Sequence, residues 1–370
     1  MDMYLYKYLL TCHKGPQLLL VKFPLNMLIL HNSMHLVYLI FVCMGILQLI
    51  STSANAASQS HSVPTNGSQE NALLTWKGSL DNHSQSKLSS WSSPANPCSS
   101  WVGIRCNKAG RISIINIASS GIKGTLDQLN FSSLPHLTAI NLSNNERYGT
   151  IPSSIGNLSR LTFLGLFSNH FSGAIPIQIG QLTNLRILYL FSNSFSGSIP
   201  KQVVFLTSLV ELDFEQNEFT GSIPPSIGNM TNLRRLTLRA NKLSGSIPLG
   251  IGNLTKLDLL ILDTNHLSGA FPEEIGKLRS LIQLSLAMNM LTGPIPQSIG
   301  DLGNLTLLYL FDNSLSGPIP EEIGNLVSLE NLALDYNNLT SKIPNSIGNL
   351  GRLTYLYLPG NKLSGHIPST

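Results

Sequence analysis

The sequence predicts an α/β solenoid, a superhelix of about eleven 24-residue repeats with a parallel concave sheet. Three observations predict it. Leucine or isoleucine stands eight, five and three residues before nearly every member of a regular series of asparagines. A near copy of L-S-G-x-I-P-x-x-I-G-N-L follows each of them. The asparagines themselves recur every 24 residues without an insertion, at Asn145, Asn169, Asn193, Asn217, Asn241, Asn265, Asn289, Asn313, Asn337 and Asn361. A fixed period of this length indicates stacked repeats.

The residues before each asparagine alternate as in a short strand. In 163–167, Leu164 and Leu166 would face the core, whereas the residues between and around them would face outward. Stacking places these strands in one parallel sheet, about 4.8 Å apart. The pattern L-x-x-L-x-L-x-x-N is that of the leucine-rich repeat. An earlier, degenerate repeat leads through Ile115 and Ile117 to Ser120, which lies 25 residues before Asn145.

Each asparagine stands where the chain leaves the strand and turns. A buried turn needs both a hydrogen-bond donor and an acceptor, and an amide side chain supplies both. We therefore expect the ten asparagines to form a ladder that bonds neighbouring turns. The Gly-x-Ile-Pro segment that follows permits a tight turn, because glycine is conformationally free and proline fixes φ.

The regions before the repeats predict passage through the secretory pathway. We divide the chain into an upstream extension (1–33), a signal peptide (34–56), a linker (57–69), an N-terminal cap (70–110) and the repeats (111–370). Residues 36–50 are apolar apart from Gln48, which is short for a membrane span but suits a signal-peptide core. Cleavage is expected after Ala56, in a small-x-small motif. An uncleaved membrane anchor is the alternative.

Two cysteines lie just before the first repeat. Cys98 and Cys106 form an isolated pair beside a solenoid end, which favours a disulfide that pins the cap. A zinc site would need four ligands, and no cluster of cysteine or histidine accompanies the pair.

Nine N-x-Ser/Thr sequons follow the apolar region, which fits a secreted glycoprotein. Several occupy the same outer turn of different repeats, and we expect the one at residue 141 to lie on an outward strand position. The sequons are at Asn66, Asn82, Asn130, Asn141, Asn157, Asn229, Asn253, Asn304 and Asn338.

Composition and motifs argue against other functions. Charged residues make up 11% of the chain, against about 25% in typical soluble domains. The net charge is +4 without a basic stripe in the sequence, so nucleic-acid binding is not indicated. None of the motifs H-E-x-x-H, G-x-S-x-G or G-x-x-x-x-G-K-S/T occurs. We expect no enzymatic activity, no cofactor and no metal site.

The repeat consensus and the region before it resemble one family. The segments 72–77 (Ala-Leu-Leu-Thr-Trp-Lys), 88–91 (Leu-Ser-Ser-Trp) and 98–106, with Trp101, resemble the N-terminal cap of plant leucine-rich-repeat receptor-like kinases. The resemblance extends over about 70–370 and implies a right-handed superhelix with an extra short strand in each L-x-G-x-I-P segment. It also implies recognition of peptides or partner receptors at the cell surface, on the concave face. The repeats are not followed by a kinase domain, a membrane span or a C-terminal cap, so we expect a truncated chain.

Outward strand positions have no role in the core, so their chemistry is informative about ligands. Aromatic side chains near the ends of the array flank charged ones near its middle, as at binding surfaces. Cross-strand salt bridges and ring packing are the structural alternative. The candidate ligand-binding residues are Tyr189, Phe191, Glu211, Asp213, Glu215, Arg235, Arg239, Asp263, Tyr309 and Phe311.

Two functions remain open at this point. The first is a receptor-type ectodomain that binds a peptide or protein ligand, with a co-receptor ectodomain as a further partner, and that signals through a kinase absent from this chain. It would lie outside the cell or on the outer face of the plasma membrane, attached only through missing C-terminal parts or an uncleaved N-terminal segment. The second is a soluble secreted inhibitor of a pathogen cell-wall-degrading enzyme, similar to the polygalacturonase inhibitors, which have about ten such repeats.

Overall fold

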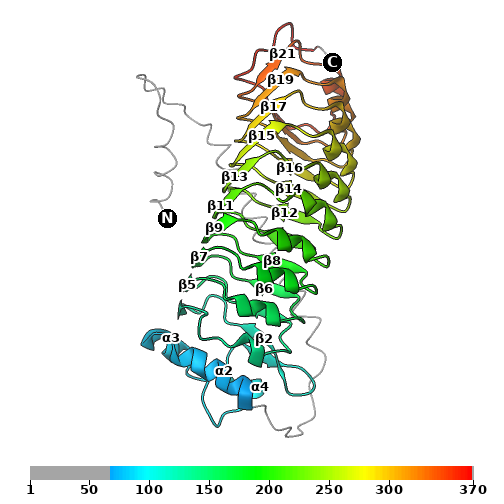
Figure 1. Cartoon of the computed structure of the whole chain (residues 1–370). Helices are drawn as coiled ribbons and strands as arrows, with labels where there is room; N and C mark the ends of the chain where they lie inside the picture. The colour runs from blue at the N-terminus through cyan, green and yellow to red at the C-terminus, as the bar shows by residue number, and fades with distance from the viewer. Residues whose placement is uncertain (1–66, 369–370) are drawn as a thin grey trace, which may run out of the picture. The chain divides into compact units, whose positions relative to one another are not determined.

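The computed structural model describes residues 67–368. These residues form a cap followed by a stack of repeats, with a strand layer along each of two sides and short helices along a third (Figure 1). The predicted upstream extension, signal peptide, most of the linker and the sequon at Asn66 lie outside the described residues. Among residues 67–368, no helix is long and apolar enough to cross a bilayer.

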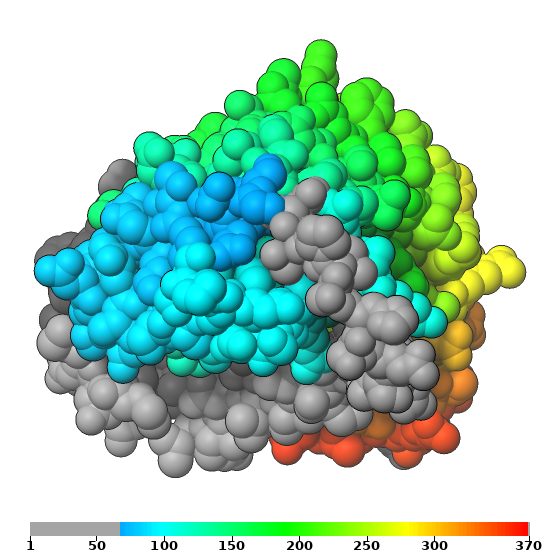
Figure 2. Space-filling model, turned by 90° about the horizontal axis from the view of Figure 1, so that it is seen from below, coloured from blue at the N-terminus to red at the C-terminus, as the bar shows by residue number. Residues whose placement is uncertain are grey.

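The cap contains three helices: α2 (Gly67–Gly78), α3 (Asn82–Lys87) and α4 (Pro97–Ser100). Asp81 begins α3 by accepting a hydrogen bond from the Ser84 backbone N–H at 2.8 Å, which satisfies a free helix donor. Trp76 and Trp91 are fully buried, and the ring of Trp91 stacks on Trp101 at a centroid distance of 5.4 Å. Cap residues cover much of this end of the stack (Figure 2).

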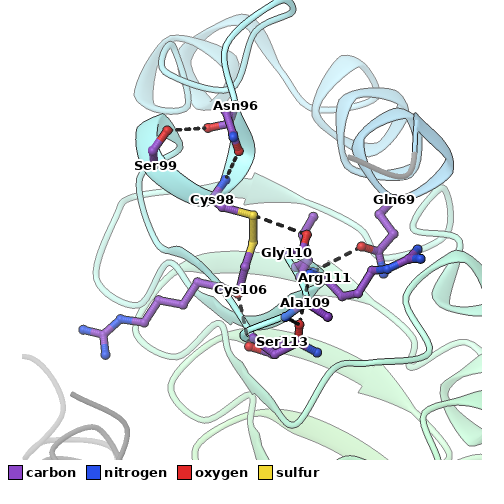
Figure 3. The surroundings of a disulfide bond; sticks show 12 residues. Gln69, Asn96, Cys98, Ser99, Cys106, Ala109, Gly110, Arg111 and Ser113 are labelled. Atoms are coloured by element: carbon purple, nitrogen blue, oxygen red, sulfur yellow. Dashed lines mark hydrogen bonds between the residues drawn. A yellow bond between two sulfur atoms is a disulfide. The ribbon is translucent and has the colours of Figure 1, made fainter. Parts of the chain in front are cut away.

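The predicted disulfide is present between Cys98 and Cys106, with a Cα–Cα distance of 5.3 Å. It joins α4 to the first strand of the main sheet, and Cys98 Sγ lies 3.5 Å from the Gly110 carbonyl oxygen (Figure 3). Beside it, Gln69 from α2 accepts a hydrogen bond from the Ile112 N–H at 3.1 Å. The bridge therefore links the cap to the strand that starts the repeats.

The main sheet has twelve strands within the described residues. The first, β1 (Ile104–Cys106), pairs antiparallel with β2, and the other eleven run parallel, which confirms the predicted parallel array. The antiparallel β1 was not predicted. The parallel strands are β2 (Ile112–Asn116), β4 (Ala139–Asn141), β6 (Phe163–Gly165), β8 (Ile187–Tyr189), β10 (Glu211–Asp213), β12 (Arg235–Thr237), β14 (Leu259–Ile261), β16 (Gln283–Ser285), β18 (Leu307–Tyr309), β20 (Asn331–Ala333) and β22 (Tyr355–Tyr357).

A second sheet of ten strands runs beside the first, which confirms the implied extra strand in each repeat. Most of its strands end at the repeated glycine or one residue after it, and this glycine has a positive φ, as at Gly245 (φ 77°), a conformation that glycine adopts without strain. The strands are β3 (Lys123–Gly124), β5 (Glu146–Gly149), β7 (His170–Gly173), β9 (Ser194–Ser198), β11 (Glu218–Gly221), β13 (Lys242–Gly245), β15 (His266–Ala270), β17 (Met290–Gly293), β19 (Ser314–Pro318) and β21 (Asn338–Thr340).

The outer turns are 3₁₀ helices, and most begin directly after the repeated proline, which occupies the N-cap position in an extended conformation, as at Pro248 (φ −69°, ψ 139°). The α-helices of the described region are confined to the cap. The 3₁₀ helices are η1 (Phe131–Ser133), η2 (Ser153–Asn157), η3 (Ile177–Gln181), η4 (Lys201–Phe205), η5 (Pro225–Asn229), η6 (Leu249–Asn253), η7 (Glu273–Lys277), η8 (Gln297–Asp301), η9 (Glu321–Asn325) and η10 (Asn345–Asn349).

The asparagine ladder has the predicted double role. Asn241 donates to the Phe214, Leu238 and Arg239 carbonyls at 2.9–3.1 Å and accepts from the Phe219 N–H at 3.0 Å. Phe214 and Phe219 belong to the preceding repeat, so the amide bonds its own turn and its neighbour's. The residue before each ladder asparagine has a positive φ, as at Ala240 (52°), which places the turn in the left-handed region.

Arg147 occupies a core position that is apolar in the later repeats. It is fully buried, and its guanidinium carbon lies 4.4 Å from the centroid of the Trp76 ring, an arrangement that a cation–π attraction favours. Its Nη1 lies 3.5 Å from the Thr125 carbonyl, whereas Nε and Nη2 have no hydrogen-bond partner. Burial lowers the pKa of Arg147 to about 9, although Asp81 opposes this shift.

Candidate functional site

The concave face consists of side chains that the main sheet arranges in rows. The parallel register pairs Glu211 with Arg235 and Asp213 with Thr237, so residues 24 apart stand side by side. Core positions repeat leucine or isoleucine, whereas the middle concave row reads Gly165, Tyr189, Asp213, Thr237, Ile261, Ser285 and Tyr309. Core packing therefore does not dictate the concave residues, and each repeat presents a different chemistry.

The first aromatic group is buried, so the expectation that Tyr189 and Phe191 are exposed is wrong. Only 4% of Tyr189 is accessible, and its ring meets Phe163 edge-on at 6.1 Å. Phe167 stacks on Phe191 with ring centroids 4.4 Å apart. The reason is local: a Cβ at Gly165 would lie 2.9 Å from the Phe163 ring, so the missing side chain leaves room for the rings to close over the strand.

The charged residues of the concave face lie on neighbouring strands, form the concave charged cluster, and several of them are buried. Arg239 lies between two carboxylates: its Nη1 is 2.8 Å from Glu215 Oε1, and its Nε is 2.9 Å from Asp263 Oδ2. Arg235 Nε lies 3.9 Å from Asp258 Oδ1, and the Tyr189 hydroxyl donates to Glu211. The cluster comprises Glu211, Asp213, Glu215, Arg235, Arg239 and Asp263. The salt bridges that the structural alternative anticipated are therefore present.

Burial raises the pKa of acids within this cluster. Burial, and then the nearby Glu215 charge, raise the pKa of Asp213 well above its usual range. Its Oδ1 accepts from the Glu215 N–H at 2.9 Å, but its Oδ2 is buried without a partner. Burial also raises the pKa of Asp263, although Arg239 opposes the shift. Burial would lower the pKa of Arg239, but Asp263 and Glu215 outweigh it and raise the pKa.

The second aromatic group is more accessible. Tyr309 and Phe311 are half-buried, with ring centroids 5.9 Å apart in an edge-on arrangement. Burial raises the pKa of Tyr309 to about 12. Further along, Tyr336 is 53% exposed and Tyr355 is 39% exposed. The apolar surface that a ligand can reach on this face therefore lies mainly in the later repeats.

The sequons differ in accessibility. Asn141 is buried on β4, and its Oδ1 accepts hydrogen bonds from the Ser143 N–H and hydroxyl at 3.2 and 2.8 Å. Asn141 does occupy an outward strand position, in register with Gly165 of the middle concave row. The expectation that its amide is available to carry a sugar is wrong, because the amide is buried and closes a local turn. Asn82, Asn130, Asn157, Asn229, Asn253 and Asn304 are exposed, and Asn338 is half-buried.

The concave face presents charged and aromatic side chains that packing and ion pairs hold in place. Within residues 67–368, no group of three or more histidine, cysteine or acidic side chains is placed to hold a metal ion. The charged cluster is held by its own ion pairs, so it offers a preformed polar surface between two aromatic groups. The sequence did not predict one feature, a basic groove on the side of the stack. The groove is lined by residues nine and seven positions before the ladder asparagines. Its cations lie in different repeats, so their alignment appears only after the repeats are superposed.

Comparison with known families and proteins agrees with this geometry. The family described as "Leucine-rich repeat region" matches residues 113–269 and 248–358, and "Leucine rich repeat N-terminal domain" matches residues 66–107. A probable leucine-rich repeat receptor-like protein kinase of Arabidopsis thaliana is 42% identical over 125 residues, 32% of this chain and 10% of the relative. The match thus spans about a tenth of that relative's length.

Two solved structures extend the comparison. The structure of the Arabidopsis receptor kinase HAESA, in complex with the peptide hormone IDA and the co-receptor SERK1, matches with a TM-score of 0.70 and 32% identity, over 80% of this chain and 54% of the matched chain in that structure. A plant ice-binding protein matches with a TM-score of 0.66 and 30% identity, over 82% of this chain and 97% of that protein. The chain therefore belongs to the leucine-rich repeat family, and its repeats are of the kind found in the ectodomains of plant receptor-like kinases.

Proposed function

We propose that residues 67–368 form a receptor-type ectodomain that binds an extended peptide, or a partner receptor, on the concave face. The observation that carries the proposal is a contrast between two sets of positions. The core positions have leucine or isoleucine in nearly every repeat, whereas the residues at the concave positions vary from repeat to repeat. A chain laid across the strands would meet a different concave side chain about every 4.8 Å, which allows it to be recognised along its length. The secretory route, the signal peptide at 34–56 and an extracellular location belong to the same proposal.

The relatives support this proposal over the alternative. The Arabidopsis relative is a receptor-like kinase, and HAESA binds a peptide hormone and a co-receptor. These comparisons do not favour the polygalacturonase-inhibitor alternative. The similarity to an ice-binding protein shows that the same architecture serves other functions, so the concave residues must be tested directly.

The structure changes which residues are best for that test. Arg239 is a poor choice for alanine substitution, because its loss would leave two buried carboxylates without their cation. Tyr309 and Phe311 are better, because they are half-buried and lie outside the leucine core. Aromatic anchors often contribute about 2 kcal/mol or more to binding, so we expect the double alanine variant to bind at least about tenfold more weakly.

The experiment uses the secreted full-length chain and a displayed library of random twelve-residue peptides. Selected peptides are synthesised, and their dissociation constants are measured against the parent, the concave variant Tyr309→Ala/Phe311→Ala, and the control Lys277→Ala/Arg279→Ala. The control residues are exposed and lie in or beside η7, on the outer side. Thermal melts confirm that each variant is folded. Peptides that lose affinity only for the control variant would contradict the proposal, as would a library that yields no binder.

A further inference from the structure

A basic groove runs beside the concave charged cluster, and Asp258 lies between the two, 4.0 Å from Arg234 in the groove and 3.9 Å from Arg235 in the cluster. It has a volume of about 760 Å³ and is lined by residues from five successive repeats. Four of its lining residues are cations: Arg160, Arg186, Arg234 and Lys256. All four are exposed. Five repeats at a spacing of about 4.8 Å give the groove a length of roughly 20 Å.

The positive charge of this groove is only partly compensated. Within the described residues, Arg160 and Arg186 form no salt bridge, and Arg234 Nη1 lies 4.0 Å from Asp258 Oδ2, at the limit of an ion pair. Lys256 Nζ donates to the Asn232 amide oxygen at 2.8 Å, which holds the ammonium in place without neutralising it. The groove thus presents three guanidinium groups and an ammonium group to solvent.

The other lining residues indicate the class of ligand. Protein partners usually bury an apolar centre with aromatic or aliphatic anchors, but Val210 is the one aliphatic side chain among the lining residues. The remainder are hydroxyl and amide side chains, such as Asn184. Guanidinium groups bind carboxylates through paired N–H donors, and hydroxyls and amides suit a polyhydroxylated chain.

We propose that this groove binds a linear acidic polysaccharide that bears carboxylates along its length. Four cations over roughly 20 Å would meet successive carboxylates, while the Ser208 hydroxyl and the Asn184 amide oxygen bond the sugar hydroxyls. Each exposed ion pair is weak on its own, so the site depends on several contacts at once along one chain. The groove is lined by other residues than the concave cluster, although Asp258 contacts a cation of each.

The test uses the secreted full-length chain and a decamer of galacturonic acid as the probe, with its fully methyl-esterified form as the uncharged control. We expect the charged decamer to bind and the esterified one to bind at least about tenfold more weakly. Raising the salt concentration should weaken binding of the charged form, because exposed ion pairs are screened. Equal binding of the two decamers would overturn the proposal.

Substitutions of the groove cations test whether the polysaccharide binds in the groove. We expect Arg186→Gln/Arg234→Gln to weaken binding about fivefold or more, and the matched convex control Lys277→Gln/Arg279→Gln to change it less than about twofold, since each exposed pair contributes little. All four residues are exposed, so each variant should melt like the parent. Equal losses in both variants would refute the location. Tighter binding of poly-glutamate than of the decamer would refute the polysaccharide and indicate an acidic peptide.

Discussion

Replacing Asn241 with leucine tests the ladder that joins the repeats. The substitution removes the acceptor for the Phe219 N–H and the donor to three carbonyls, all in a buried turn. An unpaired buried N–H costs about 1–3 kcal/mol, and the carbonyls that share the amide hydrogens cost a similar amount. We therefore expect Asn241→Leu to lower the free energy of unfolding by about 2–6 kcal/mol.

The measurement is urea unfolding of the secreted protein at pH 7, followed by circular dichroism, with the midpoint and slope compared between variants. Asn184→Leu is the matched control, because Asn184 is exposed and donates one hydrogen bond to the Ser159 carbonyl, at 2.8 Å. Its effect should stay within about 0.5 kcal/mol. The ladder argument fails if Asn241→Leu unfolds at the parent's midpoint, or if the control shifts the midpoint equally.

Three further predictions follow from the cap and the charged residues. The double variant Cys98→Ser/Cys106→Ser should lower the free energy of unfolding by about 2–3 kcal/mol, because the unfolded chain is more flexible without the disulfide. Mass spectrometry that finds both thiols free in the parent protein would contradict the disulfide itself. Arg147→Leu should raise the melting temperature at pH 8, because a buried guanidinium with two unpaired nitrogens is replaced by an apolar side chain. Asp213→Asn should have a higher melting temperature than the parent at pH 7 and the same melting temperature near pH 4. Because the pKa of Asp213 is raised in the folded state, its carboxyl stabilises the fold at low pH, and this stabilisation is lost as the pH rises. A difference in melting temperature that does not change with pH would show that Asp213 does not titrate as stated.

The period of the sequence predicted the repeats well, because each core position faces the same neighbours in every repeat. Leu164 and Leu166 are buried as expected, and the ladder asparagines bond neighbouring turns. The antiparallel β1 was beyond this argument, because it belongs to the cap and follows no period. The positive φ of residues such as Ala240 was also missed, because the residues at this position share no side-chain type.

The concave face was predicted in position but not in accessibility. Strand alternation places Tyr189 and Phe191 on that face, yet their burial depends on rings from neighbouring repeats closing over Gly165. The environment of Arg147 was equally inaccessible to sequence reasoning, because its aromatic partner Trp76 lies 71 residues earlier in the chain, in the cap. Such contacts depend on three-dimensional neighbours that a single period does not specify.

The ladder also gives the stack a direction. Asn241 bonds backward, to Phe214 and Phe219, so the polar groups of each turn are satisfied by the repeat that comes after it. The backbone itself bonds in both directions, since the Arg234 N–H donates to the Val210 carbonyl of the preceding repeat and the Asn241 N–H donates to the Thr264 carbonyl of the following one. Removing an internal repeat would therefore unpair backbone groups on both sides, but only the turn on its N-terminal side would also lose a ladder amide. Each turn thus depends on the repeat that follows it for its side-chain hydrogen bonds.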